Sequence, residues 1–259
     1  MQLNFNQDLA LSYASKSQQA RVLSEDWAEN NLFCPLCGRL HLKHLAANRP
    51  VADFLCDECG AEFELKSVQR LRFPAIIADG AYDTMIQRIT SLNNPHFFFM
   101  TYEQTSVSNL CFVPNHFFTP DIIIKRKPLA PTARRAGWVG CNINFSSIPQ
   151  SGKIPIIRNS QVVDKASVLA EVKRANQLNT PNLVGRGWLM DVLLCLQNIK
   201  TETFTLADVY KFTGRLQEKH PNNQHIQAKI RQQLQLLRDK GFITFIKPGV
   251  YRFLNILPQ

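Results

Sequence analysis

Two patterns of chemically reactive side chains overlap between residues 34 and 66. The first consists of two Cys-x-x-Cys pairs, formed by Cys34, Cys37, Cys56 and Cys59. Four thiolates at this spacing predict a structural zinc site, because a tetrahedral ion needs two short knuckles from separate parts of the chain. His41 and His44 could each replace a cysteine, but the four thiolates already satisfy the ion. We therefore expect both histidines at the surface.

The second pattern consists of two acids and a lysine, Asp53, Glu64 and Lys66. In a strand, Glu64 and Lys66 point to the same side because successive side chains alternate. Two carboxylates can bind Mg²⁺ beside a phosphodiester, with the carbonyl oxygen of Leu65 as a further ligand. Lys66 would then orient or help to deprotonate the attacking water. Such a trio also arises by chance, so a plain ion pair is the alternative.

The two patterns are expected to support each other. Residues 51–55 and 62–66 are predicted to be strands on either side of the second cysteine pair. A zinc ion bound there would hold the two strands, and thereby the two carboxylates, in register. Glu25 is a further candidate for this site. It either faces the carboxylates or is a solvated acid in the first turn of a helix capped near Ser24.

The middle of the chain predicts an α/β sheet. Residues 75–89 have apolar side chains at helical spacing, although Asp79-Gly80 could interrupt the helix. Residues 97–102 and 110–113 are typical of buried neighbouring strands. The run Phe97-Phe98-Phe99 is interpreted as core rather than as a base-stacking platform. Farther on, residues 154–157 and 161–163 predict a hairpin, and residues 170–185 a linker.

A basic loop at residues 125–138 predicts contact with nucleic acid. It combines basic side chains with one aromatic ring, and the candidates are Arg126, Lys127, Arg134, Arg135 and Trp138. Arginine and lysine on a connecting segment suit phosphates or base edges, and a tryptophan can stack on a base. The alternative is a solvated loop whose tryptophan folds back onto the core.

The chain is predicted to form two domains, residues 1–182 and residues 183–259. In the second domain, three helices precede a two-stranded hairpin, which is the order of a winged helix-turn-helix. The third helix, from about residue 223 to residue 240, has an apolar face and a polar face. The polar face suits base-edge contacts through Ala228, Arg231, Gln232 and Gln235. The expected phosphate ligands are Lys229, Lys247 and Arg252, and an ordinary solvated face is the alternative.

The composition favours an anionic partner and a reducing compartment. The chain has 259 residues, a formal net charge of +10 and a pI near 9.4, and a basic surface attracts polyphosphate. The seven cysteines are an odd number, and their paired spacing favours metal over disulfides. No secretory signal and no membrane span is visible in the sequence. We expect an intracellular, soluble protein.

Three segments carry a resemblance to a known family. They are residues 48–54 with 62–67 (NRPVADF and EFELKS), residues 126–138 (RKPLAPTARRAGW) and residues 229–234 (KIRQQL). Through them the chain resembles the DpnI-like methyl-directed (type IIM) restriction endonucleases and Dam-replacing proteins over essentially its whole length. The resemblance implies an α/β fold, in which a PD-(D/E)XK nuclease domain with an embedded four-cysteine zinc ribbon precedes a winged helix-turn-helix domain. It also implies Mg²⁺-dependent double-strand cleavage at GATC sites that contain N6-methyladenine.

The resemblance also assigns roles to individual residues. It implies that Asp53, Glu64 and Lys66 are catalytic, that the four paired cysteines bind zinc, and that Trp138 contacts the methylated adenines. Ala52 stands where the general signature of the nuclease fold has proline. A bacterial cytoplasmic monomer is implied, which acts on double-stranded DNA and has no membrane association and no obligate protein partner. The alternative is a non-catalytic zinc-ribbon and winged-helix regulator that binds DNA.

Overall fold

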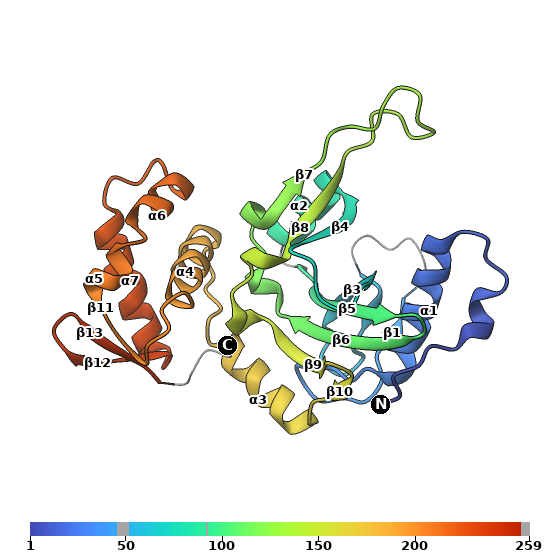
Figure 1. Ribbon diagram of the computed structural model, residues 1–259, viewed down its shortest axis with the longest axis horizontal. Helices are drawn as coiled ribbons and strands as arrows, with labels where there is room; N and C mark the ends of the chain where they lie inside the picture. Colours follow the sequence, from blue (N-terminus) through green and yellow to red (C-terminus); the bar gives the residue numbers. More distant parts are fainter. Residues whose placement is uncertain (46–51, 92, 255–259) are drawn as a thin grey trace. The chain divides into compact units, whose positions relative to one another are not determined.

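The computed structural model describes residues 1–45, 52–91 and 93–254 (Figure 1). The chain divides into two compact units, and each is considered by itself below. The first comprises Met1–Ser147 and Gly152–Asn176, and the second comprises Ile148–Ser151 and Gln177–Gln259. The domain ranges expected from the sequence, 1–182 and 183–259, remain a prediction.

A seven-stranded sheet forms the centre of the first unit. Its strands, in order across the sheet, are β1 (Lys43–His44), β2 (Phe54–Leu55), β3 (Glu62–Gln69), β5 (His96–Glu103), β6 (Ser106–Val113), β9 (Ile154–Arg158) and β10 (Gln161–Val162). Strands β3 and β5 are parallel, while their outer neighbours pair antiparallel. A parallel pair needs a crossover, and α2 (Tyr82–Thr90) lies in the connection. The predicted strand-helix-strand order is therefore confirmed.

The aromatic run in β5 belongs to the core. Phe97, Phe98 and Phe99 are all 0% exposed. Phe98 stacks on Phe63 of β3 with ring centroids 5.2 Å apart, and Phe97 stacks on Phe118 at 4.0 Å. Rings that are fully buried in this way cannot serve as a stacking platform for bases. The run instead fixes the position of β3 within the sheet.

Two helices of the first unit differ from expectation. Helix α1 (Lys16–Asn31) begins after Ser15, so Glu25 lies in its middle and the expected cap at Ser24 is wrong. Helix α3 (Lys165–Asn176) occupies the first part of the predicted linker, residues 170–176. Its buried residues, Val168, Val172 and Ala175, follow helical spacing, and the helix packs on β9. The predicted hairpin of β9 and β10 is confirmed, with positive φ at Asn159 and Ser160.

A second, three-stranded sheet of this unit has the order β4-β8-β7. Its strands are β4 (Ile76–Ala81), β7 (Ile123–Lys125) and β8 (Gly140–Asn144). The helix expected over residues 75–89 is thus wrong in its first half and correct in its second, where α2 forms. A β-bulge between Asp79 and Ala81 ends the regular pairing of β4 with β8. The segment between β7 and β8 projects from these strands as a long hairpin loop (Figure 1).

The second unit has the expected helices and hairpin. Its elements are α4 (Leu183–Leu196), β11 (Thr203–Thr205), α5 (Leu206–Tyr210), α6 (Thr213–Lys219), α7 (Ile226–Asp239), β12 (Ile243–Lys247) and β13 (Val250–Phe253). The predicted second helix is split into α5 and α6. Thr205 caps α5 and forms a capping box with Asp208. Strand β11 pairs with β13, which gives a three-stranded sheet.

Short 3-10 helices connect these elements in several places. They are η1 (Gln7–Ala10), η2 (Asn115–Phe117), η3 (Pro120–Ile122), η4 (Phe145–Ser147) and η5 (Gln150–Gly152). Across residues 1–45, 52–91 and 93–254, no helix combines the length and the apolar character needed to cross a bilayer.

Candidate active site and metal centre

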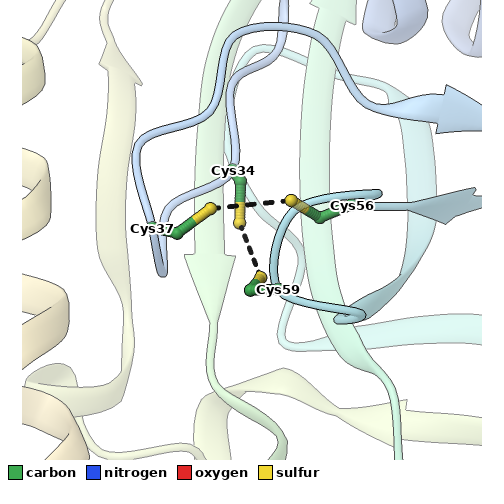
Figure 2. A group of neighbouring side chains, drawn as sticks. All are labelled: Cys34, Cys37, Cys56 and Cys59. Carbon is green, nitrogen blue, oxygen red and sulfur yellow. Dashed lines mark hydrogen bonds between the residues drawn. The ribbon is translucent and has the colours of Figure 1, made fainter.

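The four paired cysteines converge at one point of the first unit (Figure 2). Their sulfur atoms all lie within 4.8 Å of one another. The Cys34 and Cys59 sulfurs are 3.6 Å apart, as are those of Cys37 and Cys56. A tetrahedral zinc ion with Zn–S bonds of about 2.3 Å separates its sulfurs by about 3.8 Å. The residues present therefore fit a zinc ion bound by four thiolates.

Two matching turns create this convergence. In the first, the Gly38 N–H donates to the Cys34 carbonyl oxygen over 2.8 Å, and in the second the Gly60 N–H donates to that of Cys56 over 2.8 Å. Both glycines have positive φ, +80° and +71°, which a side chain would disfavour. Each Cys-x-x-Cys-Gly sequence thus forms one knuckle. The second knuckle is the turn between β2 and β3; Asp53 directly precedes β2, and Glu64 lies on β3.

Asp53, Glu64 and Lys66 also converge, as expected from their spacing. The Leu65 N–H donates a 2.7 Å hydrogen bond to Oδ2 of Asp53, which ties that carboxylate to β3. The Lys66 ammonium forms an ion pair with the Glu64 carboxylate. Residue Val51, where the first strand was expected to begin, lies outside the described residues. The expected role of the Leu65 carbonyl oxygen as a metal ligand stays a prediction.

Burial shapes the electrostatics of these groups. Loss of hydration raises the pKa of Glu64 to about 7, and the nearby Lys66 offsets only part of that effect. Burial also raises the pKa of Asp53. For Lys66, burial alone would lower the pKa, but the carboxylates of Glu64 and Asp79 raise it. Lys66 is therefore an ammonium ion at neutral pH.

Asp79 is a member of this cluster that the sequence did not reveal. Its Oδ1 atom pairs with the Lys66 ammonium and accepts a 2.7 Å hydrogen bond from the Gly80 N–H. The Asp79 side chain is 2% exposed. The segment was expected to be helical, and only the Asp79-Gly80 interruption considered there pointed to irregular backbone.

Glu25 lies beside the cluster rather than on a solvated face. Its carboxylate is 14% exposed and lies 3.2 Å from Nε2 of His44. Burial raises the pKa of Glu25, and the charge of Asp53 raises it further. The adjacent Ser24 hydroxyl is 3.1 Å from that of Ser67 in β3, which fixes α1 against the sheet. His44, expected at the surface, is half-buried by these contacts, whereas His41 is exposed.

The carboxylates fit a hard divalent cation such as Mg²⁺. The Oε2 atom of Glu64 is buried without a hydrogen-bond partner, and carboxylate oxygens are the ligands that Mg²⁺ prefers. Within the described parts of the chain, the cysteine cluster is the only group of three or more His, Cys, Asp or Glu side chains close enough for a metal. A cation here would need two carboxylates completed by backbone, phosphate and water, the usual composition of Mg²⁺ sites in phosphoryl chemistry.

The loop between β7 and β8 exposes its basic residues but not its tryptophan. Arg126, Lys127, Arg134 and Arg135 are exposed, and Trp138 is half-buried. The Arg135 guanidinium lies 4.6 Å from the centroid of the Trp138 ring. A Cβ at Gly140 would come within 2.7 Å of this ring. Trp138 therefore packs against its own loop, and the arginine covers one face of the ring. Its contact with a base remains a prediction.

Helix α7 separates its two faces as expected. Ile226, Ile230, Leu234 and Leu237 are buried. The opposite face is exposed and consists of Ala228, Arg231, Gln232 and Gln235. Arg231 donates a 2.6 Å hydrogen bond to the Tyr210 hydroxyl at the end of α5. Among the expected phosphate ligands, Lys229 bonds to Gln232 at 2.7 Å and Arg252 lies 3.7 Å from Glu202.

Two family models match this chain. One, described as the Dam-replacing family, matches residues 1–181 and thus well over half of the sequence. The other, described as the Dam-replacing HTH domain, matches residues 185–253, the stretch from α4 to β13.

Proposed function

The chain belongs to the Dam-replacing family of methylation-dependent restriction endonucleases, and we propose that it cleaves both strands of GATC sites that carry N6-methyladenine. The proposed chemistry is Mg²⁺-dependent phosphodiester hydrolysis by a type II, PD-(D/E)XK nuclease. The C-terminal helix-turn-helix domain binds DNA, and the cysteine cluster holds a structural zinc ion. We further propose that the protein acts as a monomer in the bacterial cytoplasm.

The observation that carries this proposal is the cluster of Asp53, Glu64 and Lys66. These residues come from opposite sides of a metal knuckle, yet they converge through the hydrogen bond from Leu65 to Asp53 and the ion pair of Glu64 with Lys66. A buried ammonium paired with Glu64, with the Asp53 carboxylate bound to the residue between them, is uncommon without a function, because burying charges is costly. The net charge of +10 would attract DNA to the protein and thereby to this cluster.

Each residue of the cluster has a separate proposed role. Asp53 and Glu64, with the Leu65 carbonyl oxygen, would hold Mg²⁺, which when bound would polarise the scissile phosphate and activate water. Lys66 orients the attacking water and stabilises the negative charge that develops on the phosphate. Because two carboxylates keep Lys66 protonated, it supplies a positive charge to the site and does not act as a base. The zinc knuckle keeps β2 and β3 in register.

Selectivity for methylated sites would come from both units. An N6-methyl group adds apolar surface in the major groove, and burying it against Trp138 would contribute roughly 1 kcal/mol. In the basic loop, Arg126, Lys127, Arg134 and Arg135 would contact the DNA backbone. On α7, the exposed face of Ala228, Arg231, Gln232 and Gln235 would lie in the major groove. Two methyl groups on a palindrome, read by two units, would multiply the preference.

A plasmid assay tests the proposed function. The purified protein is incubated with plasmid from methylating and non-methylating cells, with and without Mg²⁺. We expect double-strand cleavage of the methylated plasmid only, and only when Mg²⁺ is present. No cleavage of that substrate would refute the enzymatic activity, and equal cleavage of both plasmids would refute the methyl requirement.

Replacement of Asp53 separates catalysis from binding. Asp53→Asn removes one proposed cation ligand but keeps an acceptor for the Leu65 N–H. We expect cleavage to fall by at least about a hundredfold, while gel retardation of methylated DNA is unchanged. Equal losses of cleavage and binding would contradict a catalytic role.

The rival function is a DNA-binding regulator without catalysis. The ion pairs that Lys66 forms with Glu64 and Asp79 are the observation in its favour, because they give all three residues a structural purpose. The plasmid assay distinguishes the two functions. Retardation of methylated DNA without cleavage in Mg²⁺ would support the regulator.

A further inference from the structure

The Lys66 ammonium has two counterions on different strands. Glu64 lies two residues away on β3, and Asp79 comes from β4 in the neighbouring sheet. The Lys66 side chain is 16% exposed and that of Asp79 is 2% exposed. Because both charges are buried, the pair is retained only if each charge keeps a partner. Asp79 thus belongs to the cluster physically, although it lies outside the pattern of Asp53, Glu64 and Lys66.

The backbone around Asp79 is built to present this carboxylate. A β-bulge between Asp79 and Ala81 interrupts the pairing with β8, and bulges commonly redirect a side chain next to a functional site. The Gly80 N–H, which follows directly, binds Oδ1 of Asp79 over 2.7 Å. The same oxygen pairs with Lys66. The carboxylate is therefore fixed by its own strand, independently of β3.

This arrangement matters because the Lys66 ammonium and the divalent cation would both interact with the single Glu64 carboxylate. A divalent cation bound to Glu64 would compete with Lys66 for its charge and would repel the ammonium. If Glu64 were the only counterion, a cation on its Oε2 atom would leave the buried ammonium to share a single negative charge with the cation. Asp79 provides a partner that the cation need not displace.

We propose that Asp79 is a positioning residue of the nuclease site, which holds the Lys66 ammonium at the scissile phosphate while Glu64 binds the divalent cation. The inference rests on the proposed function and names a residue that this function did not include. It assigns Asp79 no contact with the cation and no contact with DNA. Its loss should consequently lower the rate of the chemical step even at saturating metal, leave the affinity for substrate unchanged, and weaken metal binding less than the loss of a metal ligand would.

The test compares single-turnover cleavage of methylated plasmid by the wild type, Asp79→Asn and Asp79→Glu. The asparagine keeps the shape and an acceptor oxygen but removes the charge. We expect the cleavage rate of Asp79→Asn at saturating Mg²⁺ to fall at least tenfold, with a smaller rise in the half-saturating Mg²⁺ concentration than Glu64→Gln causes. DNA affinity, measured with Ca²⁺ in place of Mg²⁺, should also stay within twofold. Asp79→Glu, which restores the charge in a shifted position, should have an intermediate rate.

Asp83→Asn is the matched control, because it removes the same charge from an exposed position at the start of α2. Its cleavage rate should equal that of the wild type. A wild-type rate for Asp79→Asn would overturn the inference. So would a rise in half-saturating Mg²⁺ as large as that caused by Glu64→Gln, since Asp79 would then be a metal ligand.

Three outcomes of the experiment are decisive. If Asp79→Asn shows no cooperative thermal unfolding, Asp79→Ser, which also removes the charge, decides in its place: a wild-type rate overturns the inference, and a reduced rate with unchanged DNA affinity supports it. If the wild type itself does not cleave methylated DNA, the proposed function fails. If the wild type and Asp79→Asn cleave equally, the proposed function stands and only the role of Asp79 is refuted.

Discussion

The Glu64 carboxyl group lies in a buried environment that disfavours its ionised form. Burial raises its pKa from 4.5 to about 7. Between these two values the unfolded chain has released the Glu64 proton while the folded protein still binds it. Folding stability contributed by this group therefore falls as the pH rises from about 4.5 to 7, by on the order of 3 kcal/mol. A site kept at this cost is more readily explained by cation binding than by stability.

Replacing Glu64 should remove this pH dependence. With Mg²⁺ omitted, Glu64→Gln has no proton to lose, and Lys66 keeps Asp79 as its partner. We expect the free energy of unfolding of Glu64→Gln, relative to the wild type, to be higher at about pH 8 than at about pH 5. Urea denaturation at the two pH values measures this difference. A difference that is the same at both pH values would show that Glu64 is ionised throughout.

Glu25 should act through the electrostatic field at Asp53. Its carboxylate is partly buried and close enough to Asp53 that the Asp53 charge raises the pKa of Glu25, so a charged Glu25 adds to the negative potential that attracts a cation. We expect Glu25→Gln to raise the half-saturating Mg²⁺ concentration for cleavage by about three- to tenfold. Glu29→Gln, an exposed change on the same helix, is the control. An unchanged Mg²⁺ requirement in Glu25→Gln would mean that Glu25 only anchors His44.

At the scale of elements, the zinc knuckle should control the nuclease strands. Cys59→Ser removes one sulfur from the turn between β2 and β3. Strand β2 has only two residues, so little else fixes that turn. We expect loss of bound zinc, a drop in unfolding free energy of about 4 kcal/mol or more, and loss of cleavage. Metal analysis and thermal unfolding measure the first two effects.

The control for the knuckle is Glu58→Gln, an exposed change within the same turn. It should retain zinc, stability and cleavage. Full cleavage by zinc-free Cys59→Ser would contradict a coupling between the knuckle and the carboxylates.

Sequence patterns predicted those elements whose apolar and polar side chains repeat regularly within a short segment of the chain. The alternation in residues 62–66 indicated β3, and helical spacing indicated α7 with its buried and exposed faces. Helix α3 was missed because only one narrow stripe of it is buried against β9. Its many polar residues therefore resemble a linker. Strand β4 was missed because Ile76 and Ile77 continue the apolar spacing of α2.

The candidate site was predictable as far as spacing along the chain could define it. Asp53, Glu64 and Lys66 are linked by the turn between β2 and β3, so local sequence was enough. Asp79 reaches Lys66 from another sheet, and no local pattern contains that pairing. The closeness of Glu25 to Asp53 likewise depends on how α1 packs. Long-range packing therefore supplied the part of the site that the sequence could not.

For the whole molecule, the net charge of +10 makes the salt dependence of DNA binding a direct measure of its phosphate contacts. Lys247, exposed in the hairpin of β12 and β13, is a proposed phosphate ligand, whereas Arg231 on α7 is proposed to contact base edges. Lys247→Gln should reduce the slope of log affinity against log salt by about one on every sequence.

Arg231→Gln should instead lower the preference for methylated GATC over unrelated DNA, by about 1–3 kcal/mol. Binding titrations at several salt concentrations measure both quantities, with Lys173→Gln on α3 as the control. A uniform loss of affinity in Arg231→Gln would reassign that arginine to the phosphate backbone.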